Sequence, residues 1–360
     1  MIAGGGTGGH VFPAIAIAGS IKNRFPEAQL LFVGALGRME MTRVPEAGYN
    51  IVGLPIAGLQ RRLSLSNLFL PWKLFTSLVK SISLVREFKP DAVVGVGGYA
   101  SAPLLLAARV LGIPYLIQEQ NSFAGLTNKL LGKKASAICV AFEGMESYFP
   151  AKNLRLTGNP VRKDLLELNL SQYEALKHFG LNPGKPTVLI IGGSLGARTI
   201  NEAVSAAIPD WTEKGYQIIW QTGKAFASKA EELLKQNGNS GMITMPFIKE
   251  MNYAYAAADV VVSRAGALSL AEICMAGKAS ILIPSPNVAE DHQTRNAESM
   301  SGKKAALMIP DRQATKRLGT EVSSLLEKPS EIEKIGMAAH SLAKPKACEN
   351  IVDQLISIAK

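Results

Sequence analysis

The sequence has few cysteines, no long hydrophobic run and no Asp-x-Asp pair, and each absence excludes a class of protein. Its 360 residues contain three cysteines, Cys139, Cys274 and Cys348, far apart in apolar surroundings. They predict neither a disulfide framework nor a zinc site and favour a reducing cytosol. The longest uncharged run, 92–108, contains three glycines and a proline and does not predict a membrane span. The first residues enter a short strand and a glycine loop, which predicts no secretory signal.

Positive charge is concentrated in the first half of the chain. Residues 1–163 contain 18 Lys and Arg against 8 Asp and Glu, whereas residues 164–360 contain 21 of each. A basic half attracts an anionic partner, such as nucleic acid, a lipid headgroup or a phosphorylated ligand. A generally basic, soluble surface is the alternative. No nucleic-acid-binding motif is present, so no nucleic-acid partner is expected.

The segment 65–89 favours a lipid surface among these partners. Its large apolar residues recur at helical spacing, and Pro71 suits a helix start. One face, made of Leu68, Trp72, Phe75, Val79 and Ile82, is expected to pack on the core. Surplus apolar residues then remain beside basic ones, as on proteins that lie on an anionic bilayer. The apolar members are Leu65, Phe69, Leu70 and Leu74, and the basic ones are Arg61, Arg62, Lys73 and Lys80. Plain core packing is the alternative.

Short apolar runs alternate with helical patterns along the whole chain, which predicts an α/β fold with parallel sheets covered on both faces. A short first strand is expected at 1–3. Further strands are predicted at 29–33, 92–96, 115–118, 137–141 and 154–157, and then at 187–191, 217–221, 242–246, 260–263 and 280–283. The segment GNPVRKD, 158–164, predicts an interdomain hinge, and Pro345 precedes a predicted final helix at 348–359.

Two glycine-rich loops, each after an apolar strand, indicate two nucleotide-type domains. The first is GGGTGGH at 4–10 and the second is GGSLGA at 192–197. Glycines 4, 6 and 9 satisfy the dinucleotide pattern GxGxxG, but the next strand ends without the acidic residue that would hold a ribose. The loop is therefore expected to hold a phosphate or diphosphate through backbone N–H groups and the following helix N-terminus. His10 lies where that helix begins and is either a catalytic or ligand-contacting residue or a simple cap.

The second loop offers Ser194 in place of a middle glycine, which again suits a diphosphate. A third loop, SRAGALSLAE at 263–272, places Glu272 about two turns into a helix, where its carboxylate can hold ribose hydroxyls. An exposed helix glutamate is the alternative. Because no Asp-x-Asp pair is present to bind a metal through diphosphate, the leaving group is expected to be stabilised by loop N–H groups, helix dipoles and Arg264.

Seven motifs in order make the chain resemble the MurG family. They are GGGTGGHVFPA, KPDAVVGVGGYASAP, QEQNSFAGLTNKLL, GNPVR, GGSLGAR, SRAGALSLAE and DHQTRNA. The resemblance implies the GT-B architecture, two Rossmann-like parallel-sheet domains facing a central cleft. It also implies inverting, metal-independent transfer of GlcNAc from UDP-GlcNAc to undecaprenyl-pyrophosphoryl-MurNAc-pentapeptide, with no cofactor. The family acts peripherally at the cytoplasmic face of the bacterial plasma membrane, where other cell-wall synthesis proteins are possible partners. Family members usually begin several residues earlier.

The resemblance also implies domains and site residues. Residues 1–160 would form the acceptor and membrane-associated domain, 161–344 the UDP-GlcNAc domain, and 345–360 a helix returning to the first domain. The donor positions are Arg162, Ser194, Ile248, Arg264, Glu272 and Gln293. The acceptor or phosphate positions are Thr7, Gly8, Gly9, Tyr99 and Asn121, with no metal ligands. Within them, Glu272 would hold the ribose, Gln293 the sugar hydroxyls and the Ile248 backbone the uracil.

The expected reaction is one inverting displacement, in which the MurNAc 4-hydroxyl attacks the anomeric carbon opposite UDP. His10 is the first candidate for the general base and Glu119 the second. Two other functions remain open at this stage. One is another GT-B enzyme of UDP-sugars, such as a glycolipid synthase or UDP-GlcNAc 2-epimerase, and the other is a non-catalytic UDP-sugar-binding membrane scaffold. A dehydrogenase is disfavoured by the missing ribose carboxylate.

Overall fold

The computed structural model describes residues 1–56, 70–162, 165, 170–193, 195–238 and 241–359. Within these residues the chain divides into two compact units, of which unit 1 comprises residues 1–161 and 344–360 and unit 2 residues 162–343. Unit 2 is thus inserted into unit 1, and the chain passes from one unit to the other at Val161–Arg162 and again at Ala343–Lys344.

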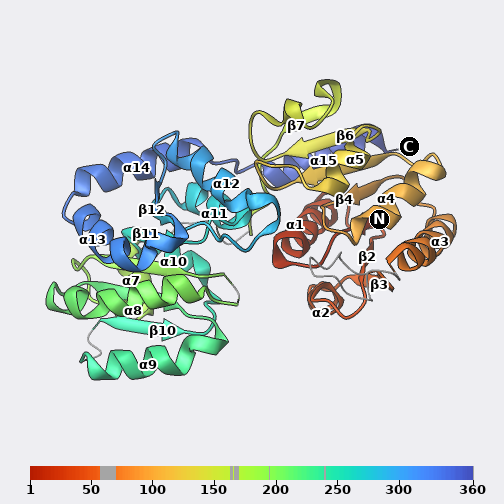
Figure 1. Ribbon diagram of the computed structural model, residues 1–360. Coiled ribbons are helices and arrows are strands. Elements are labelled where there is room, and N and C mark those ends of the chain that lie inside the picture. The colour runs from red at the N-terminus through yellow and green to blue at the C-terminus, as the bar shows by residue number, and fades with distance from the viewer. Residues whose placement is uncertain (57–69, 163–164, 166–169, 194, 239–240, 360) are drawn as a thin grey trace. The chain divides into compact units, whose positions relative to one another are not determined.

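Unit 1 contains a seven-stranded sheet in the order β3-β2-β1-β4-β5-β6-β7, and all its strand pairs are parallel (Figure 1). The strands are β1 Ile2–Ala3, β2 Leu31–Ala35, β3 Asn50–Leu54, β4 Val93–Gly95, β5 Tyr115–Glu119, β6 Ala137–Val140 and β7 Leu154–Leu156. The helices are α1 Gly8–Arg24, α2 Glu40–Glu46, α3 Leu70–Phe88, α4 Ser101–Val110, α5 Leu126–Gly132 and α15 Ala347–Ile358, with 3-10 turns η2 Met145–Ser147 and η3 Ala151–Asn153.

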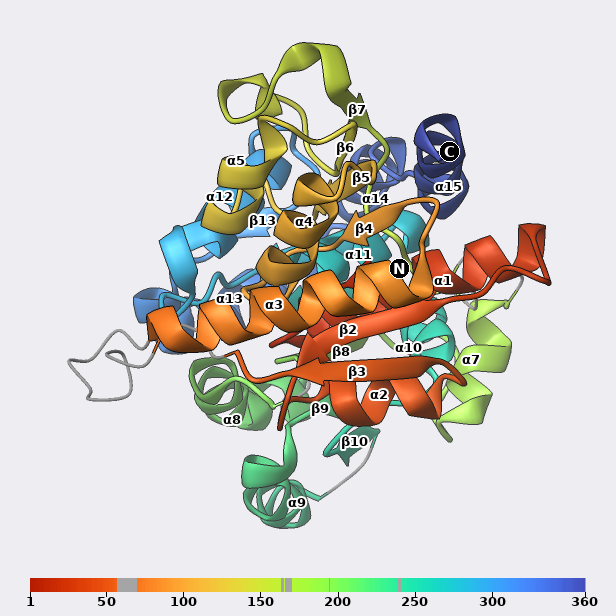
Figure 2. The same ribbon diagram turned by 90° about the vertical axis from the view of Figure 1, so that its right-hand side faces the viewer.

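Helices cover both faces of this sheet, because its central strands are apolar on both sides. On one face α1 packs against α15, and α15 also contacts β5 and β6. On the other face α3 packs against α4, and α4 against α5 (Figure 2). Crossovers of this kind bring the loops that follow the strands to the same edge of the sheet.

Unit 2 contains a six-stranded parallel sheet in the order β10-β9-β8-β11-β12-β13. Its strands are β8 Thr187–Ile191, β9 Gln217–Gln221, β10 Met242–Met245, β11 Val260–Ser263, β12 Ala279–Leu282 and β13 Leu307–Met308. The helices are α7 Gln172–His178, α8 Arg198–Glu213, α9 Ala227–Gln236, α10 Met251–Ala257, α11 Ala267–Ala276, α12 His292–Ser301, α13 Ala314–Leu326 and α14 Pro329–Ser341, with 3-10 turns η4 Lys224–Phe226, η5 Ala289–Asp291 and η6 Asp311–Gln313. Side chains of α8, α9 and α13 cover one face with a continuous apolar core.

The α/β class with two parallel sheets is confirmed, and the predicted strands recur within about two residues at each end. The predicted core face of α3 is wrong. Trp72, Phe75 and Val79 are 64%, 58% and 51% exposed, and the fully buried positions of this helix are Ser77, Ser81 and Val85. Ile82 does pack partly against the core. Residues 57–69, with Arg61, Arg62, Leu65, Leu68 and Phe69 of the prediction, lie outside the described part of the chain.

Candidate active site

The first glycine loop joins β1 to α1, with Thr7 as the N-cap of the helix. Three of its glycines are required by the structure of the loop itself. A Cβ on Gly4 would lie 2.0 Å from Val96 and one on Gly5 would lie 2.0 Å from Glu40, whereas Gly6 has φ +88°, a conformation that favours glycine. Gly9 has a different environment, because a Cβ there would meet only the Thr7 hydroxyl, at 3.6 Å. Gly9 and Thr7 are exposed, so a ligand can approach this end of the loop.

His10 lies in the first turn of α1 and packs on a second loop, the one that follows β4. Its Nδ1 is 3.2 Å from the Thr7 hydroxyl oxygen, within hydrogen-bond distance. A Cβ on Gly97 would lie 3.1 Å from His10 Nε2, and one on Gly98 would lie 2.4 Å from the Gly5 carbonyl oxygen. The glycines of GVGGYAS therefore let the two loops and the imidazole approach one another closely.

Tyr99 follows these glycines and lies against the first loop. A Cβ on Gly6 would lie 3.2 Å from the Tyr99 ring and 3.7 Å from its hydroxyl. That hydroxyl is buried and has no hydrogen-bond partner among the described residues. A buried hydroxyl without a partner is costly, so this group is suited to meet a bound ligand.

Glu119 ends β5, is 2% exposed and organises the loop that follows. Its Oε1 accepts hydrogen bonds from the Asn121 backbone N–H at 3.1 Å and the Asn121 side-chain amide at 3.4 Å. Its Oε2 accepts from Gly125 N–H at 3.0 Å and the Asn128 amide at 2.8 Å. Burial raises the pKa of Glu119 although these bonds lower it. The carboxylate therefore holds the 121–128 segment in place.

In unit 2, Glu272 of α11 joins two other elements. Its Oε1 accepts a 3.2 Å bond from Arg162 Nε, just inside the unit boundary, and its Oε2 accepts a 3.1 Å bond from the Tyr255 hydroxyl of α10. Tyr255 is fully buried, and burial raises its pKa well above the usual value, so its hydroxyl stays protonated. The Glu272 side chain is 12% exposed, which leaves it accessible to a ligand.

The second glycine loop and the segment containing Ile248 are joined by one side chain. Gln221, the last residue of β9, donates to the Gly193 carbonyl at 2.9 Å and accepts from Ile248 N–H at 3.0 Å. Gly193 has φ +81°, and a Cβ there would meet no atom within 4 Å. This glycine is therefore open to a ligand. Ser194, predicted to bind diphosphate, lies outside the described residues.

Arg264 and Gln293 hold the loops at the carboxyl ends of β11 and β12. Arg264 Nη1 donates to the Ile283 carbonyl at 3.1 Å and forms an ion pair with Asp311. Asp311 also accepts a 3.1 Å bond from the Thr199 hydroxyl. Gln293 Oε1 accepts from Ser285 N–H at 2.8 Å.

The described structure therefore places the predicted residues in two sets. Unit 1 brings together Thr7, Gly8, Gly9, His10 and Tyr99, with Glu119 and Asn121 one strand farther along the sheet. Unit 2 brings Arg162 to Glu272, and Arg264 and Gln293 to the 283–285 segment after β12, whereas Ile248 lies in the segment after β10. Gln221, Tyr255 and Asp311 contact these site residues but were not predicted from the sequence. Only Gln221 had a signal, since a polar residue at the carboxyl end of a parallel strand commonly faces the ligand edge.

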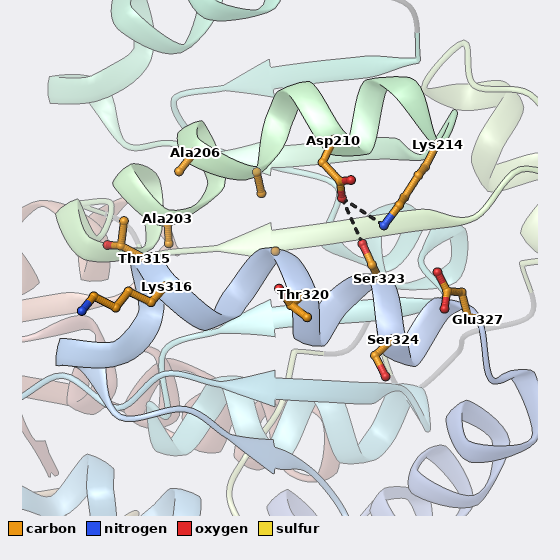
Figure 3. A pocket seen from close by; sticks show the side chains of 12 residues that line it. Ala203, Ala206, Asp210, Lys214, Thr315, Lys316, Thr320, Ser323, Ser324 and Glu327 are labelled. Carbon is orange, nitrogen blue, oxygen red and sulfur yellow. Dashed lines mark hydrogen bonds and ion pairs between the residues drawn. The ribbon is translucent and has the colours of Figure 1, made fainter.

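A groove of about 410 Å³ on unit 2 lies apart from these loops, between α8 and α13 (Figure 3). Small side chains such as Ala203 and Thr320 line it, and at one end Asp210 of α8 pairs with Lys214 at 3.1 Å and accepts a 3.4 Å bond from the Ser323 hydroxyl of α13. Among the described residues that line it, none belongs to the predicted site.

Comparison with known proteins identifies the family. Residues 1–140 match the glycosyltransferase family 28 N-terminal domain and residues 187–353 match the family 28 C-terminal domain. A UDP-N-acetylglucosamine--N-acetylmuramyl-(pentapeptide) pyrophosphoryl-undecaprenol N-acetylglucosamine transferase of Parabacteroides distasonis is 50% identical, over 99% of this chain and 97% of its own. The Cytophaga hutchinsonii transferase of the same name is 51% identical, over 99% and 96%. The chain belongs to the MurG family.

A solved structure extends this result to three dimensions. The crystal structure of Acinetobacter baumannii MurG is 30% identical, with a TM-score of 0.80 over 99% of both chains. A Neisseria meningitidis UDP-GlcNAc 2-epimerase, 12% identical with a TM-score of 0.68 over 99% of both chains, shares the fold alone. The GT-B architecture expected of a MurG chain is therefore confirmed.

Proposed function

We propose that this protein transfers GlcNAc from UDP-GlcNAc to the 4-hydroxyl of lipid-linked MurNAc-pentapeptide, converting lipid I to lipid II in peptidoglycan synthesis. The observation that carries this is the full-length similarity to transferases named for that reaction.

Unit 2 is proposed to bind the donor. Glu272 holds the ribose hydroxyls, because a carboxylate fixed by Arg162 and Tyr255 presents its oxygens in one orientation. Gly193, Ser194 and nearby amides hold the diphosphate, and the Ile248 backbone meets the uracil. Gln293 binds sugar hydroxyls, and Arg264 stabilises the leaving diphosphate through the loops that it joins to Asp311.

Unit 1 is proposed to bind the acceptor. Thr7, Gly8 and Gly9 at the start of α1 receive its diphosphate, since the N-terminus of a helix favours an anion. Asn121 contacts the acceptor, and so does the Tyr99 hydroxyl, which has no hydrogen-bond partner among the described residues. Glu119, whose oxygens accept four bonds from the following loop, positions Asn121.

The chemistry is proposed to be a single inverting displacement without a metal. The bond between the MurNAc 4-oxygen and the anomeric carbon forms as the bond from that carbon to UDP breaks, which gives a β-1,4 linkage. His10 accepts the hydroxyl proton at Nε2 when its Nδ1 proton is directed to Thr7. The departing diphosphate is neutralised by loop N–H groups and helix dipoles rather than by a metal ion.

The protein is proposed to work at the cytoplasmic face of the plasma membrane, with other cell-wall proteins as possible partners. Trp72, Leu74, Phe75 and Val79 of α3 are exposed, and Leu126 and Leu130 of α5 are exposed as well. Lys80 of α3 is exposed, as are Lys133 and Lys134 in the turn that follows α5. Apolar residues beside lysines bind anionic bilayers. No helix of the described residues is both long enough and apolar enough to span a bilayer.

One assay tests the reaction and the absence of a metal together. UDP release from UDP-GlcNAc would be measured with and without a short-chain lipid-linked MurNAc-pentapeptide, in EDTA. We expect release only with the acceptor, and undiminished by EDTA. Tight UDP binding without acceptor-dependent release would instead indicate the scaffold function or a different acceptor. Release abolished by EDTA and restored by magnesium or manganese would contradict the metal-free mechanism.

A further inference from the structure

Glu40 is a buried carboxylate that none of the steps above uses. It is the first residue of α2, five residues after the end of β2, and is 0% exposed. Its two oxygens accept hydrogen bonds from Gly6 N–H, at 3.2 and 3.0 Å, and Oε1 also accepts from Ala35 N–H at 3.0 Å. The side chain therefore lies inside the first glycine loop.

Two glycines from different segments make room for this carboxylate. A Cβ on Gly5 would lie 2.0 Å from Glu40 Oε1, and a Cβ on Gly34 of β2 would lie 2.5 Å from Glu40 Cγ. Contacts this short do not occur between real atoms without a shift. These two glycines are therefore explained by the glutamate and not by a ligand.

The carboxylate also changes which part of the loop can bind an anion. Gly6 N–H already donates to the Glu40 carboxylate. A phosphate placed there would find no free N–H donor and would be repelled by the negative charge of Glu40. At the start of α1, the described atoms nearest a Cβ on Gly8 or Gly9 belong to Phe12, Met39 and Thr7 and include no carboxylate, and Gly9 is exposed. An anion is thereby directed toward the Thr7–Gly9 end of the loop.

We infer that Glu40 is a positioning residue for the acceptor: its carboxylate fixes Gly6 at φ +88° and keeps phosphate groups away from that amide. In identifying the directed anion as the acceptor's diphosphate, this inference rests on the proposed function. The internal contact itself does not depend on it.

The main test compares Glu40→Gln with Glu46→Gln in the full chain. Glu46 is a matched control, because it lies on the same helix with its side chain 52% exposed, paired with Arg43. Glutamine keeps the size of Glu40 but replaces one acceptor oxygen with an NH2 group that cannot accept from Gly6. We expect amide hydrogen exchange in peptides spanning 4–10 to accelerate at least fivefold in Glu40→Gln and to be unchanged in Glu46→Gln.

Kinetics give a second readout that a merely structural role would not move. In Glu40→Gln the KM for the lipid acceptor should rise about tenfold, while the KM for UDP-GlcNAc stays within twofold. Inhibition by inorganic pyrophosphate, competing with the acceptor, should tighten at least threefold because the repelling charge is gone. An unchanged exchange rate, an unchanged pyrophosphate Ki or a parallel rise of both KM values would overturn the inference.

Gly34→Ala distinguishes the effect of the position of Glu40 from the effect of its charge. This variant also provides a test if Glu40→Gln does not fold. Its methyl group displaces Glu40 and leaves the carboxylate charged. We expect faster exchange at 4–10 and a higher acceptor KM, but no tightening by pyrophosphate. Wild-type behaviour in all three would overturn the inference. If the wild-type enzyme transferred nothing to the lipid acceptor, the proposed function would fail, whereas the exchange comparison would still decide the role of Glu40.

Discussion

The Tyr255 hydroxyl donates a 3.1 Å hydrogen bond to Oε2 of Glu272, from a side chain that is itself fully buried. The carboxylate proposed to hold the donor ribose thus accepts from a neutral donor at Oε2 and from the Arg162 guanidinium at Oε1. The two contacts restrict its rotation before any ligand arrives.

Removing that hydroxyl should weaken donor binding. Tyr255→Phe removes one hydrogen bond to a charged group, and we expect a loss of about 1.4 kcal/mol, or roughly tenfold in Kd. Glu272→Ala should have a larger effect in the same direction. Titration calorimetry with UDP-GlcNAc measures both. Tyr253→Phe is the control, since Tyr253 lies on the same helix and stacks on His178, with ring centroids 4.2 Å apart. Equal losses in Tyr253→Phe and Tyr255→Phe would contradict the assignment.

Removing the His10 imidazole should affect turnover rather than donor binding. His10→Ala deletes the proposed base, and general-base catalysis typically contributes about 10²- to 10⁴-fold to rate. We expect kcat to fall within that range while the Kd for UDP-GlcNAc stays within about twofold of wild type, because His10 lies in unit 1. Steady-state kinetics and calorimetry on the same preparation test this division. Equal effects of His10→Ala and Glu272→Ala on both quantities would refute it.

Burial of Glu119 should be visible as a dependence of stability on pH. Burial raises the pKa of Glu119 in the folded protein, so the folded state holds its proton at a higher pH than the unfolded state does. The stability that this group contributes is fully present below its unfolded pKa, about 4.3, and is lost as pH rises through the folded pKa.

Thermal melting of wild type and Glu119→Gln at a series of pH values measures this contribution. We expect the Tm of wild type minus that of Glu119→Gln to decrease as pH rises from about 4.3. Glu146→Gln, at an exposed position of the η2 turn, is the control and should show a constant difference from wild type. A difference that grows with pH in Glu119→Gln would show that hydrogen bonds outweigh burial.

The exposed aromatic pair of α3 should control association with lipid. The rings of Trp72 and Phe75 lie 6.0 Å apart, and both are more than half exposed. Each buried aromatic side chain contributes about 1.5–3 kcal/mol, so the Trp72→Ser, Phe75→Ser double variant should lose at least tenfold in affinity for phosphatidylglycerol-rich vesicles. Vesicle co-sedimentation measures the loss. Met337→Ser, which removes a 60% exposed apolar side chain from unit 2, should bind as wild type does. Unchanged binding of the double variant would exclude this patch.

Strands and glycine loops could be predicted because their signals are local. The runs 187–191 and 217–221 have apolar, β-branched centres and are bounded by loops, and both match the observed strands. The edge strands β3 and β13 were missed, because Asn50–Leu54 is only partly buried and Leu307–Met308 has two residues. The core face of α3 was misassigned because the helix carries apolar residues around most of its circumference, while two of its three buried positions are serines, Ser77 and Ser81.

Partnerships between distant residues could not be predicted in this way. Arg162 and Glu272 are 110 positions apart, and Glu40 and Gly6 are 34 apart. Sequence spacing carries no information about such pairs until the fold brings their strands to a common edge. The glycines at 5 and 34 illustrate the limit, since nothing in the sequence says that both accommodate the same glutamate.

The final helix bears on how this protein can be dissected. Ile351 and Val352 of α15 are buried in the same core as α1, although 182 residues of unit 2 separate them from the rest of unit 1. A gene fragment ending at Val161 would therefore keep α1 on this face of the sheet but leave the core that α15 covers exposed. Expressing unit 1 alone calls for a fusion of 1–161 to 344–360 through a short linker, whereas unit 2 is already one continuous reading frame.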